Sequence, residues 1–220
     1  RQMIDQGLAA ELADIAGAGL TRGRRVLESP CGRIAAVDGK NVLNFASNDY
    51  LGLAGNAEIA AALAAGAVRW GVGSGASHLV SGHLAPHETL EQEIADFTGF
   101  PRALTFSTGY LANLAIVPTL ATRGAVIFSD KLNHASLIDA MQLAKAQGAE
   151  TQRYAHCDMA ALERLLVASD AETKLIVSDA VFSMDGDLAP LPLLFELAER
   201  YDAWLVIDDA HGFGVLGPQG

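Results

Sequence analysis

The sequence predicts an α/β protein with a mostly parallel central sheet, because short apolar runs alternate with amphipathic helices through its second half. Continuous apolar runs of this length are typical of strands that are buried on both faces. They occupy residues 103–106, 125–128, 175–177 and 203–207, with a weaker strand predicted at 151–154. Helices with one apolar face are predicted at residues 111–120, 135–145, 159–167 and 193–200. Each strand–helix–strand passage would join two parallel strands of one sheet.

The beginning of the chain has a different pattern, and we expect an N-terminal segment at residues 1–55 packed on a large domain at 56–220. Apolar side chains recur at helical spacing over residues 4–18. Two short strands are predicted next, and Asp38-Gly39 between them is a hairpin-turn signal. These strands lie at residues 33–37 and 42–45, and further helices are predicted at 57–68 and from Pro86 onward.

Composition limits the classes of function. The chain has 220 residues, of which 50% are hydrophobic and 19% charged, as in globular proteins. Its formal net charge of -11 argues against a nucleic-acid partner, since phosphates require a basic face. Apolar segments stop well short of the ~20 residues that span a bilayer, and no signal peptide is evident. Cys31 and Cys157 are far apart without a CxxC pattern, so we expect free thiols and a cytoplasmic location without membrane attachment.

Candidate functional residues follow the predicted strands. In an open α/β sheet, ligands bind beyond the carboxyl ends of the strands. Asp208 and His211 follow the last strand, His134 follows an earlier one, and Ser183 follows the strand between them. An acid in this position can keep a cationic ring nitrogen protonated, although Asp at a strand end also caps turns. An imidazole there can stack on a flat ring, although a capping or packed histidine is the more ordinary interpretation of one such residue.

A phosphate site is predicted at Thr108-Gly109-Tyr110, where a strand gives way to a helix. The amino terminus of a helix offers unpaired N–H groups and a positive dipole end, and glycine permits close approach. An ordinary helix cap would have the same residue types. A phosphate cradle, a stacking ring and an acid for a ring nitrogen together describe pyridoxal 5′-phosphate.

Two other kinds of site are less well supported. Gly71-Val72-Gly73-Ser74-Gly75-Ala76 and Gly212-Phe213-Gly214-Val215-Leu216-Gly217 imitate a dinucleotide fingerprint, but the first follows a helix and the second lacks a helix after it. His78, His83 and His87 have spacings that zinc ligands can adopt, but Pro86 interrupts the helix and no HExxH motif is present. We therefore expect no metal site.

Several motifs together resemble the α-oxoamine synthases, which are fold type I pyridoxal-phosphate enzymes. The resemblance extends over nearly the whole chain. The motifs that carry it are Ser47-Asn48-Asp49-Tyr50-Leu51-Gly52, Gly73-Ser74-Gly75, Ser81-Gly82-His83, Thr108-Gly109-Tyr110, Asn133-His134-Ala135-Ser136, Val181-Phe182-Ser183-Met184-Asp185-Gly186-Asp187 and Asp208-Asp209-Ala210-His211-Gly212.

The resemblance implies a role for each candidate residue. Asp208 would pair with the pyridinium nitrogen, His211 would bind the phenolic oxygen, and His134 would stack on the ring. Gly109 and Tyr110 would seat the cofactor with Thr108, and Ser183 would contact it. Arg22 and Asn48 would help His134 to bind substrate, and no metal is implied. Family members are homodimers with the site at the subunit interface, so a dimer is expected.

The resemblance also implies a reaction, a decarboxylative condensation of an amino acid with an acyl thioester. Asp208-Asp209-Ala210-His211-Gly212 favours the branch that joins L-alanine to pimeloyl-CoA or pimeloyl-acyl carrier protein. Glycine-using acyltransferases and a non-catalytic binding module are the alternatives. None of Lys40, Lys131, Lys145 and Lys174 stands in the family's lysine motif, so we expect the catalytic lysine and the C-terminal domain beyond Gly220.

Overall fold

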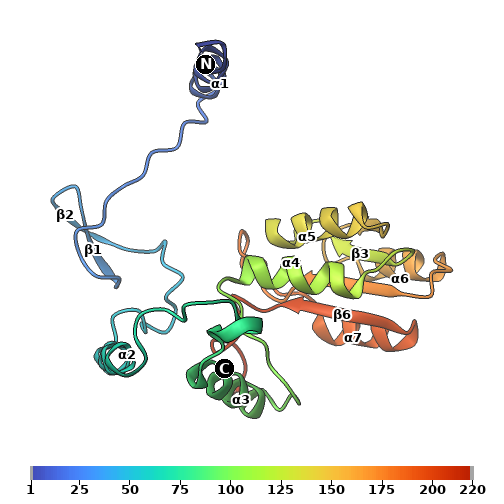
Figure 1. The fold of residues 1–220 in the computed structure, drawn as a ribbon. Coiled ribbons are helices and arrows are strands. Elements are labelled where there is room, and N and C mark those ends of the chain that lie inside the picture. The colour runs from blue at the N-terminus through green and yellow to red at the C-terminus, as the bar shows by residue number, and fades with distance from the viewer. Residues whose placement is uncertain (1, 219–220) are drawn as a thin grey trace. The chain divides into compact units, whose positions relative to one another are not determined.

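A computed structural model of the chain describes residues 2–218, with side chains from residue 7. The chain divides into two compact units, Arg1–Trp70 and Gly71–Gly220 (Figure 1). The domain boundary predicted near residue 55 stays a prediction.

The first unit contains a long helix, a hairpin and a second helix. Its elements are α1 (Gln2–Gly17), β1 (Ile34–Val37), β2 (Lys40–Leu43) and α2 (Ala57–Trp70). Strands β1 and β2 pair antiparallel, which confirms the predicted hairpin. Its turn residues Asp38 and Gly39 have φ angles of 52° and 70°, the left-handed pair that matches the twist of a two-residue hairpin.

The second unit confirms the predicted α/β fold with a mostly parallel sheet. Its sheet has the order β4-β3-β5-β6, and every neighbouring pair is parallel. The strands are β3 (Val126–Asp130), β4 (Glu150–Tyr154), β5 (Lys174–Asp179) and β6 (Ala203–Asp208). The helices are α3 (Ala85–Thr98), α4 (Gly109–Leu120), α5 (Ala135–Ala146), α6 (Met159–Val167) and α7 (Leu191–Arg200), preceded by a short π-helix, η1 (His78–Gly82).

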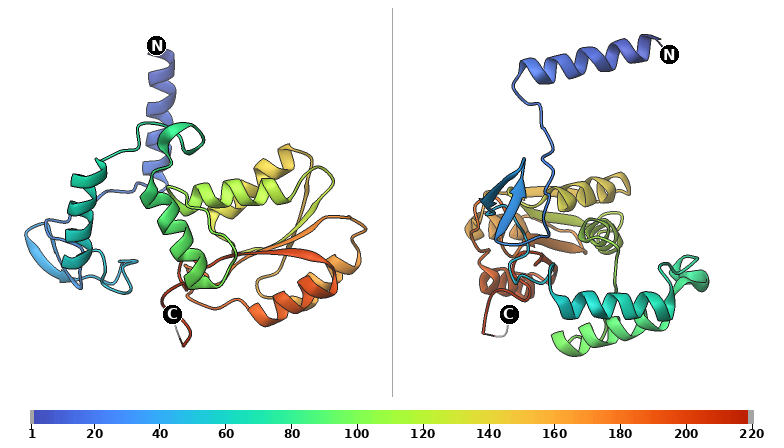
Figure 2. Two further views of the ribbon diagram at one scale, coloured as in Figure 1. Left: turned by 60° about the horizontal axis from the view of Figure 1, so that its bottom comes forward. Right: turned by 90° about the vertical axis from the view of Figure 1, so that its left-hand side faces the viewer.

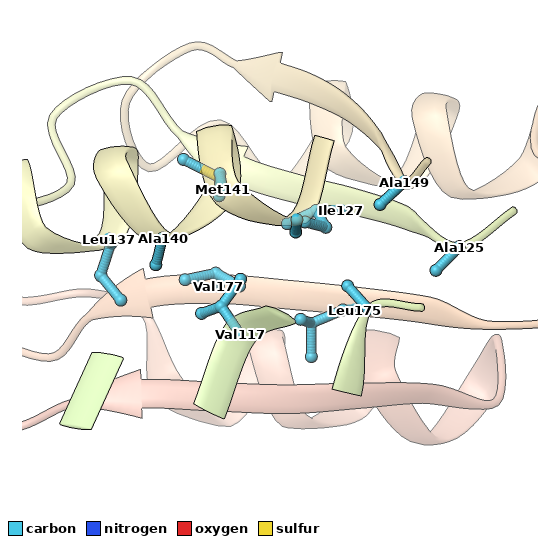
Figure 3. Close-up of a cluster of buried hydrophobic side chains, with 11 residues drawn as sticks. Val117, Ala125, Ile127, Leu137, Ala140, Met141, Ala149, Leu175 and Val177 are labelled. Atoms are coloured by element: carbon cyan, nitrogen blue, oxygen red, sulfur yellow. The ribbon is translucent and has the colours of Figure 1, made fainter. Parts of the chain in front are cut away.

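Helices cover both faces of this sheet, α4 and α5 on one and α6 and α7 on the other (Figures 1 and 2). Successive strand residues point to opposite faces. Ile127 and Val177 therefore pack with Leu137, as Figure 3 shows, whereas Phe128 and Ile176 join the second cluster. Burial on both faces explains why these strands read as continuous apolar runs.

One predicted strand is wrong. Residues 103–106 form no strand, and Leu104 is 77% exposed. The amide and the hydroxyl of Thr105 both donate to Glu91 Oε1 at 2.8 Å, so a side chain of α3 takes the place of a ladder partner. No described strand pairs with this segment, and an apolar run without such a partner remains irregular.

Among the described residues, no helix combines the length and hydropathy that a bilayer crossing requires.

Candidate functional site

The carboxyl ends of β3, β5 and β6 lie at one edge of the sheet. Asp179 and Asp208 are register partners at the ends of β5 and β6. Asn133, which is 4% exposed, holds the segment after β3 against β5. Its amide donates to Val177 O at 2.8 Å, and its Oδ1 accepts the Asp179 N–H at 3.1 Å. The predicted convergence holds for the ends of β3, β5 and β6, whereas the predicted strand at residues 103–106 is absent.

The Asp208 carboxylate is held in a fixed orientation. Asn113 Nδ2 donates to Asp208 Oδ2 at 2.7 Å, and Ala210 N donates to Asp208 Oδ1 at 3.1 Å. Asn113 also donates to Ser136 Oγ at 2.9 Å. A carboxylate held by donors on both oxygens is ready to bind a cation in a fixed direction.

Sequence reasoning did not select Asn113 as a site residue. It follows Gly109 by four residues, so it lies one turn into α4 on the same face as the phosphate candidate. Asn113 is 6% exposed, and a buried amide needs a polar partner. The available signal in the sequence was an amide side chain on an otherwise apolar helix.

Negative charge is concentrated at this edge. Asp179 is 5% exposed, and burial, followed by the charge of Asp208, raises its pKa to about 6. The His134 amide, 3.0 Å from Asp179 Oδ2, acts in the opposite direction. Burial and Asp208 also raise the pKa of Asp209. A cation bound here would relieve the repulsion between these carboxylates.

His134 is the N-cap of α5, and its ring is oriented by Ser136. The ring Nδ1 accepts from Ser136 N at 3.2 Å and lies 2.7 Å from Ser136 Oγ. Because Asn113 donates to the same Oγ, the Ser136 hydroxyl proton is directed to the His134 ring. A hydrogen-bonded chain therefore connects Asp208 with His134, which is itself exposed and able to meet a ligand.

The start of α4 is compatible both with a phosphate site and with an ordinary helix cap at Thr108-Gly109-Tyr110. Thr108 Oγ1 accepts the Leu111 N–H at 3.1 Å, so it does cap the helix. The first amides of a helix have no intrahelical acceptor, and the space beside Gly109 is open out to 4 Å from a Cβ position. The Tyr110 hydroxyl donates to Asp139 Oδ2 at 2.6 Å, which raises the Tyr110 pKa and fixes its ring beside this opening.

The other predicted residues lie in loops. Ser183 is exposed in the turn after β5, where Phe182 N donates to Asp187 O at 2.9 Å. His211 is half-buried in the turn after β6. Arg22 and Asn48 belong to the first unit, and their role as substrate ligands stays a prediction.

Residues 40–220 match the profile of the family described as aminotransferase class I and II. The chain belongs to this family. Curated relatives include 8-amino-7-oxononanoate synthase of Dechloromonas aromatica, which is 78% identical over 99% of this chain, and that of Herminiimonas arsenicoxydans, which is 62% identical over 99%. The chain spans 56% and 55% of their respective lengths.

Several solved structures have a similar fold. Serine palmitoyltransferase of Sphingomonas wittichii is 29% identical, with a TM-score of 0.82 over 93% of this chain and 51% of that one. A variant of the S. paucimobilis enzyme, solved with bound PLP-myriocin, is 32% identical, with a TM-score of 0.82 over 91% of this chain and 50% of that one. The Francisella tularensis 8-amino-7-oxononanoate synthase is 32% identical, with a TM-score of 0.60 over 74% of this chain and 43% of that one. These matches agree with the fold type I architecture predicted from the sequence.

Proposed function

We propose that this chain forms part of a pyridoxal-phosphate-dependent 8-amino-7-oxononanoate synthase. It would condense L-alanine with a pimeloyl thioester, carried on CoA or acyl carrier protein, in the biosynthesis of biotin. The observation that carries the proposal is the fixed orientation of Asp208, set by donors on both carboxylate oxygens at the edge where β5 and β6 end.

The residues of this edge fit the cofactor. The cofactor supplies an electron sink that stabilises negative charge beside its ring. This sink is strongest while the ring nitrogen stays protonated, and the carboxylate of Asp208 would hold that proton. Burial, followed by the charge of Asp208, raises the pKa values of Asp179 and Asp209, and a cationic partner here would offset both effects. The matched serine palmitoyltransferase structure with bound PLP-myriocin supports pyridoxal phosphate as the cofactor.

The remaining groups would orient the bound molecule. The opening beside Gly109 suits a phosphate, with Thr108 and Tyr110 on either side. His134 would lie on the ring face, since Ser136 already fixes its orientation. In this proposal Ser183 and His211 contact the cofactor.

The substrate assignment rests on similarity. Relatives up to 78% identical are named 8-amino-7-oxononanoate synthase. The motif Asp208-Asp209-Ala210-His211-Gly212 points to the same branch of the family. Arg22 and Asn48 are proposed as substrate ligands, and the working unit would be a homodimer.

The test is product formation by the purified enzyme of which this chain forms part, supplied with pyridoxal phosphate, L-alanine and pimeloyl-CoA. Mass spectrometry should detect 8-amino-7-oxononanoate together with release of free CoA. Parallel reactions contain glycine with acetyl-CoA or succinyl-CoA. Turnover only with glycine would move the protein to the 2-amino-3-ketobutyrate CoA ligase or 5-aminolevulinate synthase type. Absence of turnover with every pair would favour a binding role.

A further inference from the structure

Three histidines of the second unit gather at the amino terminus of α3, and none of them has a role assigned above. One ring nitrogen from each of His78, His83 and His87 lies within 4.8 Å of the others. The ring centroids of His78 are 5.0 Å from His83 and 4.8 Å from His87. His83 Nδ1 and His78 Nδ1 are only 2.7 Å apart, close enough to share one proton. We name these three residues the histidine triad.

The local backbone explains how the triad forms although Pro86 interrupts the helical spacing. The π-helix η1 closes through a bond from Gly82 N to Ser77 O at 2.9 Å, which is an i to i+5 pattern. Residues five apart are therefore neighbours here, which brings His83 beside His78. A side chain at Gly82 would collide with the carbonyl of Ala76, so this tight closure requires glycine.

The tautomer of His83 suits metal binding. Its Nε2 lies 3.0 Å from Glu88 Oε2, and a carboxylate only accepts, so Nε2 carries the proton. The lone pair of Nδ1 then faces His78 Nδ1. Histidine ligands commonly donate their other ring N–H to a carboxylate in this way, which fixes the ring and raises its basicity.

The ring of His87 supplies the third nitrogen. Its Nδ1 now accepts the Leu84 N–H at 3.0 Å, within the first turn of α3. Coordination through this atom would replace that bond, which an exposed helix end can exchange with water. Two further carboxylates, Glu88 and Glu91, lie within reach of His83 and make the surroundings favourable for a cation.

A second candidate cluster, made of Asp130, His156 and Cys157, is less suitable. Asp130 Oδ1 already accepts from Leu132 N at 2.8 Å and contacts His156 Nδ1 at 3.0 Å, and Oδ2 accepts from Cys157 N at 2.8 Å. Burial raises the Cys157 pKa to about 11, which keeps the thiol protonated at neutral pH.

We propose that His78, His83 and His87 form a binding site for a borderline divalent ion such as Zn²⁺. The ion would replace the proton between the Nδ1 atoms of His78 and His83, with Glu88 supporting His83 from behind. Imidazole nitrogens are preferred zinc ligands, and zinc separates two ligand nitrogens by slightly more than 3 Å at tetrahedral geometry. Exposed rings can move apart by that amount. The site would tie η1 to α3.

The experiment is a Zn²⁺ titration of the tag-free protein against a chromophoric chelator, with and without bound cofactor. We expect one Zn²⁺ per chain and a loss of affinity of at least tenfold in each of His78→Gln, His83→Gln and His87→Gln. Glu88→Gln keeps all three ligands and should weaken binding about 10-fold. Glu93→Gln, on the same helix outside the triad, is the matched control and should leave the affinity unchanged.

A second readout uses the unmodified protein, so that a variant's folding does not decide the result. Zn²⁺ should shift the ¹⁵N ring resonances of His78 and His83 and leave those of His156 unchanged. Wild-type affinity in the His78→Gln/His83→Gln double variant would overturn the proposal. So would an equal loss in Glu93→Gln, or zinc-induced shifts confined to His156.

Discussion

Replacing Asp179 with asparagine should remove a pH-dependent instability that the structure places at the end of β5. The Asp179 side chain is 5% exposed, and its pKa in the folded protein is about 6, against 3.8 in the absence of these surroundings. Asparagine keeps the shape and still accepts from the His134 amide through its carbonyl oxygen. The variant therefore isolates the carboxylate charge.

The sign follows from proton binding by the two states. Between pH 4 and pH 6 the folded protein holds a proton on Asp179 that the unfolded chain has released, so the free energy of unfolding falls as pH rises. A difference of about 2 pKa units corresponds to about 3 kcal/mol, because one unit is worth 1.36 kcal/mol. The stabilisation from the proton bound to Asp179 is present near pH 4 and is lost above about pH 6.

Urea unfolding of wild-type and Asp179→Asn protein without cofactor, from pH 4 to pH 7, measures this effect. The stability of the variant relative to wild type should rise by about 2–3 kcal/mol over the range. Titrating groups that do not interact with Asp179 cancel in the difference between the two proteins. A difference that stays constant with pH would refute the reasoning that Asp179 resists ionisation.

Three further predictions concern stability and are measured by urea unfolding near pH 7. Asn113→Ala should lower the free energy of unfolding by about 2–3 kcal/mol, because it removes one donor to Asp208 and the donor to Ser136 Oγ. A loss below about 0.5 kcal/mol would show that these bonds do not hold the site. Leu162→Ala should cost about 2–5 kcal/mol, since Leu162 is fully buried, whereas Val167→Ala, on the exposed side of α6, should change stability by less than about 0.5 kcal/mol. Gly82→Ala should cost about 1–3 kcal/mol, because the added methyl group meets the preceding backbone, and unchanged stability would contradict the closure of η1.

The sequence was sufficient for the elements whose apolar pattern reflects their own burial. The runs at β3 and β5 are apolar because helices cover both faces, so periodicity and burial agree. The turn at Asp38-Gly39 was predictable because few residues other than Asn, Asp and Gly adopt two successive left-handed conformations.

The sequence was insufficient where long-range partners decide the outcome. Residues 103–106 can form a strand only if a neighbouring strand pairs with them. Their apolar character does not indicate whether such a strand is present. The contact of Asn113 with Asp208 joins residues 95 positions apart, and no local pattern predicts Asp208 as the partner. The contacts within the histidine triad depend on a π-helical turn, which is rare, so α-helical spacing did not predict them.

In the proposed function, the Asp208 carboxylate keeps the ring nitrogen of the bound cofactor protonated. The most direct test is the ¹⁵N resonance of pyridoxal phosphate, labelled at its ring nitrogen and bound to wild-type, Asp208→Asn and Asp209→Asn protein. The nitrogen should be protonated in wild type and in Asp209→Asn at a pH where the free ring is neutral, and should be unprotonated in Asp208→Asn. The same protonation state in Asp208→Asn as in wild type would contradict the assignment of Asp208.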